Sequence, residues 1–388
     1  MRSSPPKVAI RGAARSAVPA GLIAVIAWPG VPLPMRLGAA GALFAFWAAV
    51  YARYRAAGRR QTRHEWELLR RTDRQALRRH YDERVPTMEQ EFEQWGPYYA
   101  YKHQMRYNLV ARAVRDNLPP GGRVLDTGCG AALVAARMLD LDAEYLGLDF
   151  GGPHIQYAAR KLREADGRLR VRFVRADAEQ IPLIDACVDV VVMSEVIEHL
   201  LRPDRAVWEV ARVLRPGGTF IMTTNNACEV PLRSPLANPL AWFEKALGTG
   251  HPSLISHRHW VWPEPVDREL LPAQAEDVYV PHTHHIPAET CGMLASAGLK
   301  TPRWSTFEFP PPQSVTAALL AKAGSAGRRL ADATEWVAQH APLVNRLGTH
   351  LFMLARKTGA PVAADPPPGV WPGPVPQVLG PFPDDLNW

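Results

Sequence analysis

One acid and two glycines stand at alternate positions in the stretch RVLDTGCGAA, residues 123–132. Asp126 follows a short apolar run, and Gly128 and Gly130 come after it. Glycines let a backbone approach a ligand without a Cβ atom in the way, and a carboxylate is a two-oxygen acceptor suited to hydroxyl donors. These residue types indicate a ligand-binding loop, for which two ligands compete: a dinucleotide and another adenosine-bearing cofactor.

The spacing of the loop disfavours the dinucleotide. Its fingerprint is G-x-G-x-x-G, in which the third glycine allows a helix to pack closely on a strand. The corresponding position here is Leu133, a bulky residue, and the dinucleotide pattern does not call for an acid where Asp126 stands. The loop therefore points to the other class of cofactor.

A second group of reactive side chains lies in SEVIEHL, residues 194–200. Glu195, Glu198 and His199 are spaced i, i+3 and i+4, so one face of a helix could carry all three. Carboxylates and an imidazole can take a proton from a hydroxyl group or hold a divalent ion that acidifies it. The spacing leaves both chemistries open.

Regular elements must position these two groups. Short apolar runs ending in a polar residue alternate with helical stretches: the runs are RVLD, EYLGLD, VRFVRAD, VDVVVMS and TFIMTT, and the helical stretches are MRYNLVARAVRDNLPPGG, LVAARML, IQYAARKLREA and RAVWEVARVL. RPGG is expected to turn the chain into TFIMTT. A further helix is expected over 287–297, with strands near 303–309 and 349–356. This alternation predicts an α/β fold with a parallel-dominated, Rossmann-like sheet and helices on both faces.

The ordered motifs resemble those of the class I S-adenosylmethionine (SAM)-dependent methyltransferases, of the methyltransferase-11/23 and quinone-pathway O-methyltransferase kinds. Besides D-x-G-x-G, the resemblance rests on EYLGLD, RADAEQIPL, VDVVVMSEVIEHL, ARVLRPGGTFIMTT and HTHHIPAETCGMLASAGL. It covers about 97–226 and 280–357. It implies the class I methyltransferase sheet and SAM as the cofactor.

The resemblance also implies roles for single residues. Asp126 would hold the methionine end of the cofactor, Asp149 both ribose hydroxyls, and Asp177 the adenine edge. Phe150 would cover the adenine face, and the third glycine of the family pattern is Ala132 here, which should tighten the turn. The cofactor-binding residues implied are Asp126, Gly128, Gly130, Asp149, Phe150, Asp177, Ala178 and Ser194.

For SEVIEHL the resemblance leaves two mechanisms. The same letters occur in metal-assisted small-RNA 2′-O-methyltransferases and in quinone-pathway catechol O-methyltransferases, where the implied ligands are Glu195, Glu198, His199 and His284, with His282 or His259 as substitutes. Oxygen and nitrogen ligands suit Mg²⁺ or Mn²⁺. Many related methyltransferases carry the letters without a metal, and His199 would then act as a base or orienting group.

The amino terminus carries a different signal. Between Ala17 and Ala52 the single charge is Arg36, beside the bend PGVPLPMR, and basic residues flank the segment on both sides. Two short spans, about 17–31 and 37–52, fit a ~30 Å hydrocarbon core better than one helix. Positive charge on both flanks favours a membrane hairpin with both ends in the cytoplasm. A cleaved signal peptide or a buried apolar hairpin is the competing interpretation.

The remaining composition sets the domain boundaries. We expect the hairpin at 1–54, a basic helical linker at 55–96, the methyltransferase domain at 97–357 with a lid insertion about 227–280, and a proline-rich tail at 358–388. The chain has a net charge of +7, with arginines crowded between Arg53 and Arg79. The basic segment is either a solvated helix face or a segment that lies on anionic lipid. Because the run adjoins the apolar segment and lacks interleaved aromatics, nucleic acid is the less favoured partner.

The sequence thus predicts a multi-pass protein of the cell membrane, with two spans and a cytoplasmic SAM-dependent methyltransferase domain. We expect it to O-methylate a lipophilic or lipid-linked acceptor. Two alternatives stay open: a methyltransferase of a soluble small metabolite, and a SAM-binding membrane scaffold without catalysis.

Overall fold

The computed structural model describes residues 97–226 apart from 164, residues 285–308, and residues 323–358 apart from 342, 343 and 347. It also describes residues 74–83 and part of 22–49. The expected lid (227–280), His284, and the tail from residue 359 onward lie outside the described residues.

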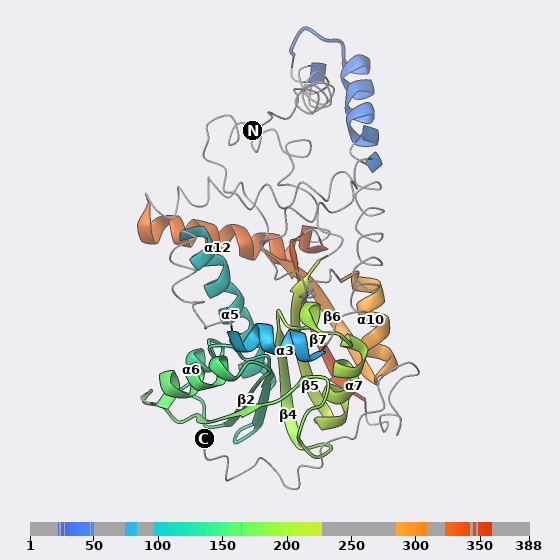
Figure 1. The fold of residues 1–388 in the computed structure, drawn as a ribbon. Coiled ribbons are helices and arrows are strands. Elements are labelled where there is room, and N and C mark those ends of the chain that lie inside the picture. The colour runs from blue at the N-terminus through green and yellow to red at the C-terminus, as the bar shows by residue number, and fades with distance from the viewer. Residues whose placement is uncertain are drawn as a thin grey trace, which may run out of the picture.

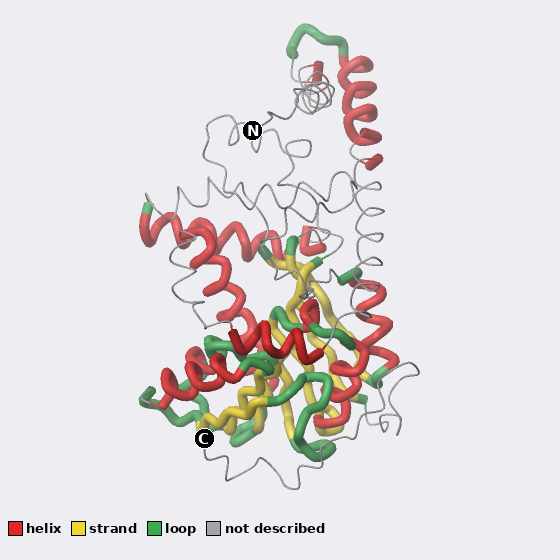
Figure 2. Tube along the Cα trace, in the orientation of Figure 1, coloured by secondary structure: helices red, strands yellow, loops and turns green. Residues whose placement is uncertain are grey.

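The described strands form one sheet, drawn in yellow in Figure 2. It has seven strands in the order β3-β2-β1-β4-β5-β7-β6. The strands β1 to β5 pair in parallel, and β7 is antiparallel to both of its neighbours, β5 and β6. Their bounds are β1 Arg123–Thr127, β2 Glu144–Asp149, β3 Arg170–Arg175, β4 Val188–Ser194, β5 Leu214–Asn225, β6 Leu299–Phe307 and β7 His350–Lys357. The predicted parallel-dominated α/β sheet is confirmed.

Helices cover both faces of this sheet (Figure 1). Side chains of α5 (Pro97–Asn117) and α6 (Gly152–Arg163) pack in one apolar core cluster, and those of α7 (Pro203–Val213) and α10 (Pro287–Ser296) pack in the other. Strand β4 supplies Val190 and Val192 to one cluster and Val191 and Met193 to the other. A strand buried on both faces reads as a continuous apolar run, as VDVVVMS does.

Two local predictions are wrong. LVAARML was expected to be helical, but the chain forms turns and a short 3₁₀ helix, η1 (Ala135–Arg137). The positive φ of 53° at Ala132 keeps the chain out of a right-handed helix just where one would begin. RPGG was expected to be a turn before a strand, whereas β5 already begins at Leu214 and includes it.

The predicted membrane hairpin lies partly outside the described residues, which include most of its second span. Residues 33–46 are helical, so this helix begins inside the predicted bend rather than after it. Within the described part of the chain, no helix combines the length and apolar character needed to span a bilayer. In the predicted linker, residues Arg74–Glu83 form the helix α3.

The sheet brings the reactive segments to one edge. The carboxyl ends of parallel strands meet at the same edge, so Thr127, Asp149, Ser194 and Asn225 end their strands together. Because β7 is antiparallel, its first residue, His350, is paired with Asn225 at that edge. The last strand of the sheet therefore adds a side chain to the edge at which the parallel strands end.

Candidate active site

The loop after β1 is built from left-handed backbone conformations. Gly128 and Gly130 have φ values of 70° and 50°, and Ala132 follows with 53°. A Cβ at Gly128 would lie 2.3 Å from Cγ2 of Val196. Glycine is required at residue 128 by both its conformation and its closeness to Val196.

Asp149 at the end of β2 ties this loop to the next turn. Its Oδ2 accepts a hydrogen bond of 2.9 Å from the Gly130 N–H, and its Oδ1 accepts one of 2.9 Å from the Gly151 N–H. Burial raises the pKa of its carboxyl group, and the backbone donors oppose that rise. The acid thus organises the glycine loop as well as lying at the mouth of the sheet.

Asp126 lies deeper than its expected role suggests. It is 2% exposed, and its Oδ2 accepts a 2.6 Å hydrogen bond from the Tyr145 hydroxyl group on β2. Burial raises its pKa to about 7 despite that bond. In this structure the carboxyl group of Asp126 is therefore almost completely enclosed by protein.

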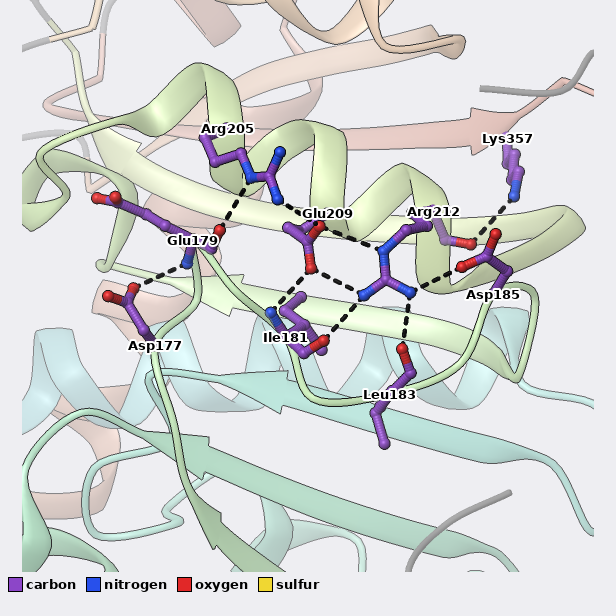
Figure 3. A network of polar contacts seen from close by, with 9 residues as sticks. All are labelled: Asp177, Glu179, Ile181, Leu183, Asp185, Arg205, Glu209, Arg212 and Lys357. Carbon is purple, nitrogen blue, oxygen red and sulfur yellow. Dashed lines mark hydrogen bonds and ion pairs between the residues drawn. The ribbon is translucent and has the colours of Figure 1, made fainter. Parts of the chain in front are cut away.

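The segment after β3 is fixed by a charged network (Figure 3). Arg212 donates to the backbone carbonyls of Ile181 at 2.8 Å and Leu183 at 2.7 Å, and Glu209 accepts from the Ile181 N–H at 2.9 Å. Arg205 donates to the carbonyl of Glu179 at 3.1 Å. Helix α7 therefore holds the loop that carries Asp177 and Ala178.

SEVIEHL does not form the expected helical face. Glu195 follows β4 with φ at 57°, and a short 3₁₀ helix, η2, spans Ile197–His199. The prediction is wrong because the left-handed residue Glu195 separates the two acids from any common helix. Glu198 is 1% exposed and accepts a 3.0 Å hydrogen bond from Thr224, while His199 is partly exposed.

Glu195 belongs instead to a buried cluster of charges. Its Oε2 lies 3.1 Å from Nε2 of His350 and 3.5 Å from a terminal nitrogen of Arg106. The other ring nitrogen of His350 contacts Glu308, which also pairs with Lys102 at 2.9 Å. One imidazole therefore lies between two carboxylates at the end of the sheet.

The cluster sets the protonation states of the two SEVIEHL acids apart. Burial acts to raise the pKa of Glu195, but the charges of His350 and then Arg106 hold it well below its usual range. Burial, and then the charge of Glu195, raise the pKa of Glu198 to about 8. Against the effect of burial, Glu195 and Glu308 raise the pKa of His350 to about 9. Near neutral pH, Glu195 and His350 are ionised and Glu198 is protonated.

The described members of the expected metal site do not fit a divalent ion. Arg106 and His350 already neutralise Glu195, so an ion there would be placed against two cations. Within the described ranges no group of three or more His, Cys, Asp or Glu side chains is arranged to hold a metal. His284 itself is outside those ranges; its neighbour His285 pairs with Asn226 beside the end of β5.

Several residues of the edge were not predicted from the sequence. Arg106 lies on α5, and Glu308 and His350 flank the antiparallel strands, where no motif marks them. The signal available was the position of His350 at the start of the last strand and of Glu308 at the end of the preceding one. Ser194, which was predicted, shares a 2.9 Å hydrogen bond with Thr223.

Part of the chain is similar in sequence to known methyltransferases. Residues 125–222 match the family model described as a methyltransferase domain. The chain is 33% identical over 129 residues to a probable S-adenosylmethionine-dependent methyltransferase of Mycolicibacterium smegmatis, which covers 33% of this chain and 46% of that protein. It is 33% identical over 126 residues to a ubiquinone biosynthesis O-methyltransferase of Mesorhizobium japonicum, covering 31% and 50%.

Another relative is a demethylmenaquinone methyltransferase of Clavibacter sepedonicus, 31% identical over 112 residues, 29% of this chain and 44% of that one. The chain spans about half the length of these curated relatives. Among solved structures, a SAM-dependent methyltransferase of Methanosarcina mazei aligns with a TM-score of 0.39 and 13% identity, over 63% of this chain and 97% of that one.

Proposed function

We propose that the protein, whose residues 125–222 match a methyltransferase domain, transfers a methyl group from SAM to a hydroxyl oxygen of a small, quinone-like acceptor. The observation that carries the proposal is the shared edge of the sheet. There the glycine loop, which donates a hydrogen bond to Asp149, lies next to Glu195 and Glu198. Near neutral pH the first of these acids is ionised and the second is protonated. The relatives named for ubiquinone and demethylmenaquinone support an aromatic acceptor.

The cofactor residues keep the roles expected of them. Gly128 and Gly130 let the backbone approach the cofactor, and Asp149 accepts from the ribose hydroxyl groups. Asp177, with the Ala178 backbone, binds the adenine edge, and Phe150 covers its face. Asp126 supports the methionine end from beneath the loop.

SAM supplies an electrophilic methyl group on a sulfonium sulfur. In the transfer the methyl–sulfur bond breaks, a methyl–oxygen bond forms, and the acceptor hydroxyl group loses its proton. The ionised form of Glu198 can receive that proton, and with a pKa of about 8 this form is a minor fraction near neutral pH that grows as the pH rises toward 8. Glu195 stays ionised beside Glu198, so the different environments of the two acids give them different protonation states. His199 orients the acceptor.

We propose a reaction without a metal, since Glu195 is already neutralised by Arg106 and His350. Treatment with a chelator followed by dialysis should leave the rate of methyl transfer unchanged, and added Mg²⁺ or Mn²⁺ should not raise it. A rate that vanished with chelator and returned with either ion would restore the metal mechanism.

We also propose that residues 17–52 anchor the protein in the cell membrane, with the methyltransferase domain in the cytoplasm and a lipophilic or lipid-linked acceptor within reach. The sequence supports this through its apolar spans and positive flanks. Tags at residues 1 and 388 should both be protected from external labelling in intact cells. Labelling of either tag from outside would contradict the topology.

The whole proposal is tested in two steps. Calorimetry should show binding of SAM and of S-adenosylhomocysteine, and none of NAD. Incubation of the protein and radiolabelled SAM with lipid and small-molecule extracts should then label an acceptor, which mass spectrometry identifies. Binding without any methyl transfer would favour the non-catalytic scaffold, and a water-soluble labelled product would favour the soluble metabolite.

A further inference from the structure

Helix α3 precedes the methyltransferase domain in the chain and is nevertheless fastened to both loops that the proposed function assigns to adenosine. Asp82 accepts from Arg175 at 2.6 and 2.7 Å and from the Gly152 N–H at 3.2 Å. Tyr81 meets Phe150 edge to face, with ring centroids 6.3 Å apart. The carboxyl end of α3 is thus bound to the turn that follows Asp149.

The amino end of α3 is bound to the second loop. Arg74 forms ion pairs with both Asp177 and Glu179. Burial and the neighbouring Asp177 raise the pKa of Glu179 to about 7, and Arg74 opposes this rise. Without a cation between them, the two carboxylates would repel each other, and Asp177 would lose the orientation that Arg74 gives it.

The loop that carries Asp177 is also held by hydrogen bonds within itself and to α7. Asp177 Oδ1 accepts from the Glu179 N–H at 2.9 Å, and Glu179 Oε1 accepts from the Arg202 N–H at 2.8 Å. Arg205 and Arg212 fix the loop to α7 (Figure 3). Asp177 is therefore held by the Glu179 N–H and by Arg74, which approaches from α3.

We propose that α3 is the cover of the adenine pocket and that Arg74 is a specificity-determining residue of the cofactor site. It holds Asp177 so that the carboxylate accepts from the 6-amino group of adenine. A carboxylate oxygen has two lone pairs, so Asp177 can accept from Arg74 and from the amino group together. This inference rests on the proposed binding of SAM.

The ligand pair that tests it differs at one group. S-adenosylhomocysteine carries the 6-amino group, and its 6-deamino analogue, with purine in place of adenine, carries only hydrogen there, from which a carboxylate cannot accept a hydrogen bond. We expect the wild-type protein to prefer the first by about tenfold or more, as one lost hydrogen bond to a charged acceptor predicts. In Arg74→Ala the preference should fall to less than about threefold, and Arg74→Lys should restore part of it.

The matched control is Arg79→Ala, which removes an exposed arginine from the same helix and should keep the wild-type preference. Circular dichroism of each variant checks the fold. A wild-type ratio in Arg74→Ala, or tighter binding of S-adenosylhomocysteine, would overturn the role of Arg74 alone. Absence of S-adenosylhomocysteine binding by the wild-type protein would overturn the proposed function as well.

Discussion

Nε2 of His350 lies 3.1 Å from Oε2 of Glu195, so the first residue of β7 neutralises the acid that follows β4. The imidazole also contacts Glu308 beyond the end of β6. Three strand ends are thereby joined through one ring, and the charge of Glu195 that raises the pKa of Glu198 is held in place.

Replacement of His350 should cost much stability. In His350→Gln the two carboxylates lose their shared cation and keep Arg106 and Lys102, so the loss should be about 1–3 kcal/mol, the cost of removing one partner from largely buried polar groups. Urea denaturation should show this loss in the free energy of unfolding. His340→Gln, at an exposed histidine of α12 (Gly324–His340), is the control and should change it by less than about 0.5 kcal/mol.

Glu198 should make the protein less stable as the pH rises. Its folded pKa of about 8 lies above the ordinary value of 4.5, so its contribution is complete below pH 4.5 and is lost progressively up to pH 8. Glu198→Gln mimics the protonated side chain, and the difference between variant and wild type should grow over this window. The rate of methyl transfer should rise through about pH 8 in the wild type alone. A parallel pH dependence in the variant would remove Glu198 from both roles.

The two glycines of the first loop should respond differently to alanine. In Gly130→Ala the added Cβ has no neighbouring atom within 4 Å. Only the φ of 50° is unfavourable for alanine, and it should lower the free energy of unfolding by about 1–2 kcal/mol. Gly128→Ala adds a contact of 2.3 Å with Val196, which should lower the free energy of unfolding by a further ~1–3 kcal/mol. Thermal unfolding of both variants measures the difference, and equal costs would contradict the close approach.

Asp149→Asn should weaken binding of S-adenosylhomocysteine by about tenfold to a hundredfold, the range expected for hydrogen bonds to a charged acceptor. The amide also sets a donor against one of the two backbone N–H groups, of Gly130 or Gly151, that Asp149 accepts from. Asp189→Asn is the control, since Asp189 likewise accepts a backbone N–H, at 2.8 Å from Arg123, but at the opposite edge of the sheet. Calorimetry should find its affinity unchanged. Equal losses in the two variants would mean that Asp149 acts through stability alone.

The strand segments and most helices could be predicted from the sequence, because buried parallel strands are apolar runs of the right length and the glycine loop has a recognisable spacing. The helix expected at LVAARML was wrong, since φ at Ala132 depends on how the loop closes around Asp149. The acids of SEVIEHL lie at the carboxyl edge of the sheet, but not on the common helical face that their spacing suggested. Which cations reach Glu195 depends on the antiparallel placement of β7, and nothing in the letters around His350 encodes that partner.

The placement of β7 between β5 and β6 also sets the order in which the molecule is completed during synthesis. The parallel strands β1 to β5 leave the ribosome well before residues 350–357, and β6 cannot join them until the last described strand fills the gap between it and β5. Until then the acids at residues 195 and 308 lack the imidazole that joins them. A nascent chain therefore has the glycine loop and Asp149 in place while the cluster around Glu195 is incomplete, and this edge of the sheet is finished only when β7 is added.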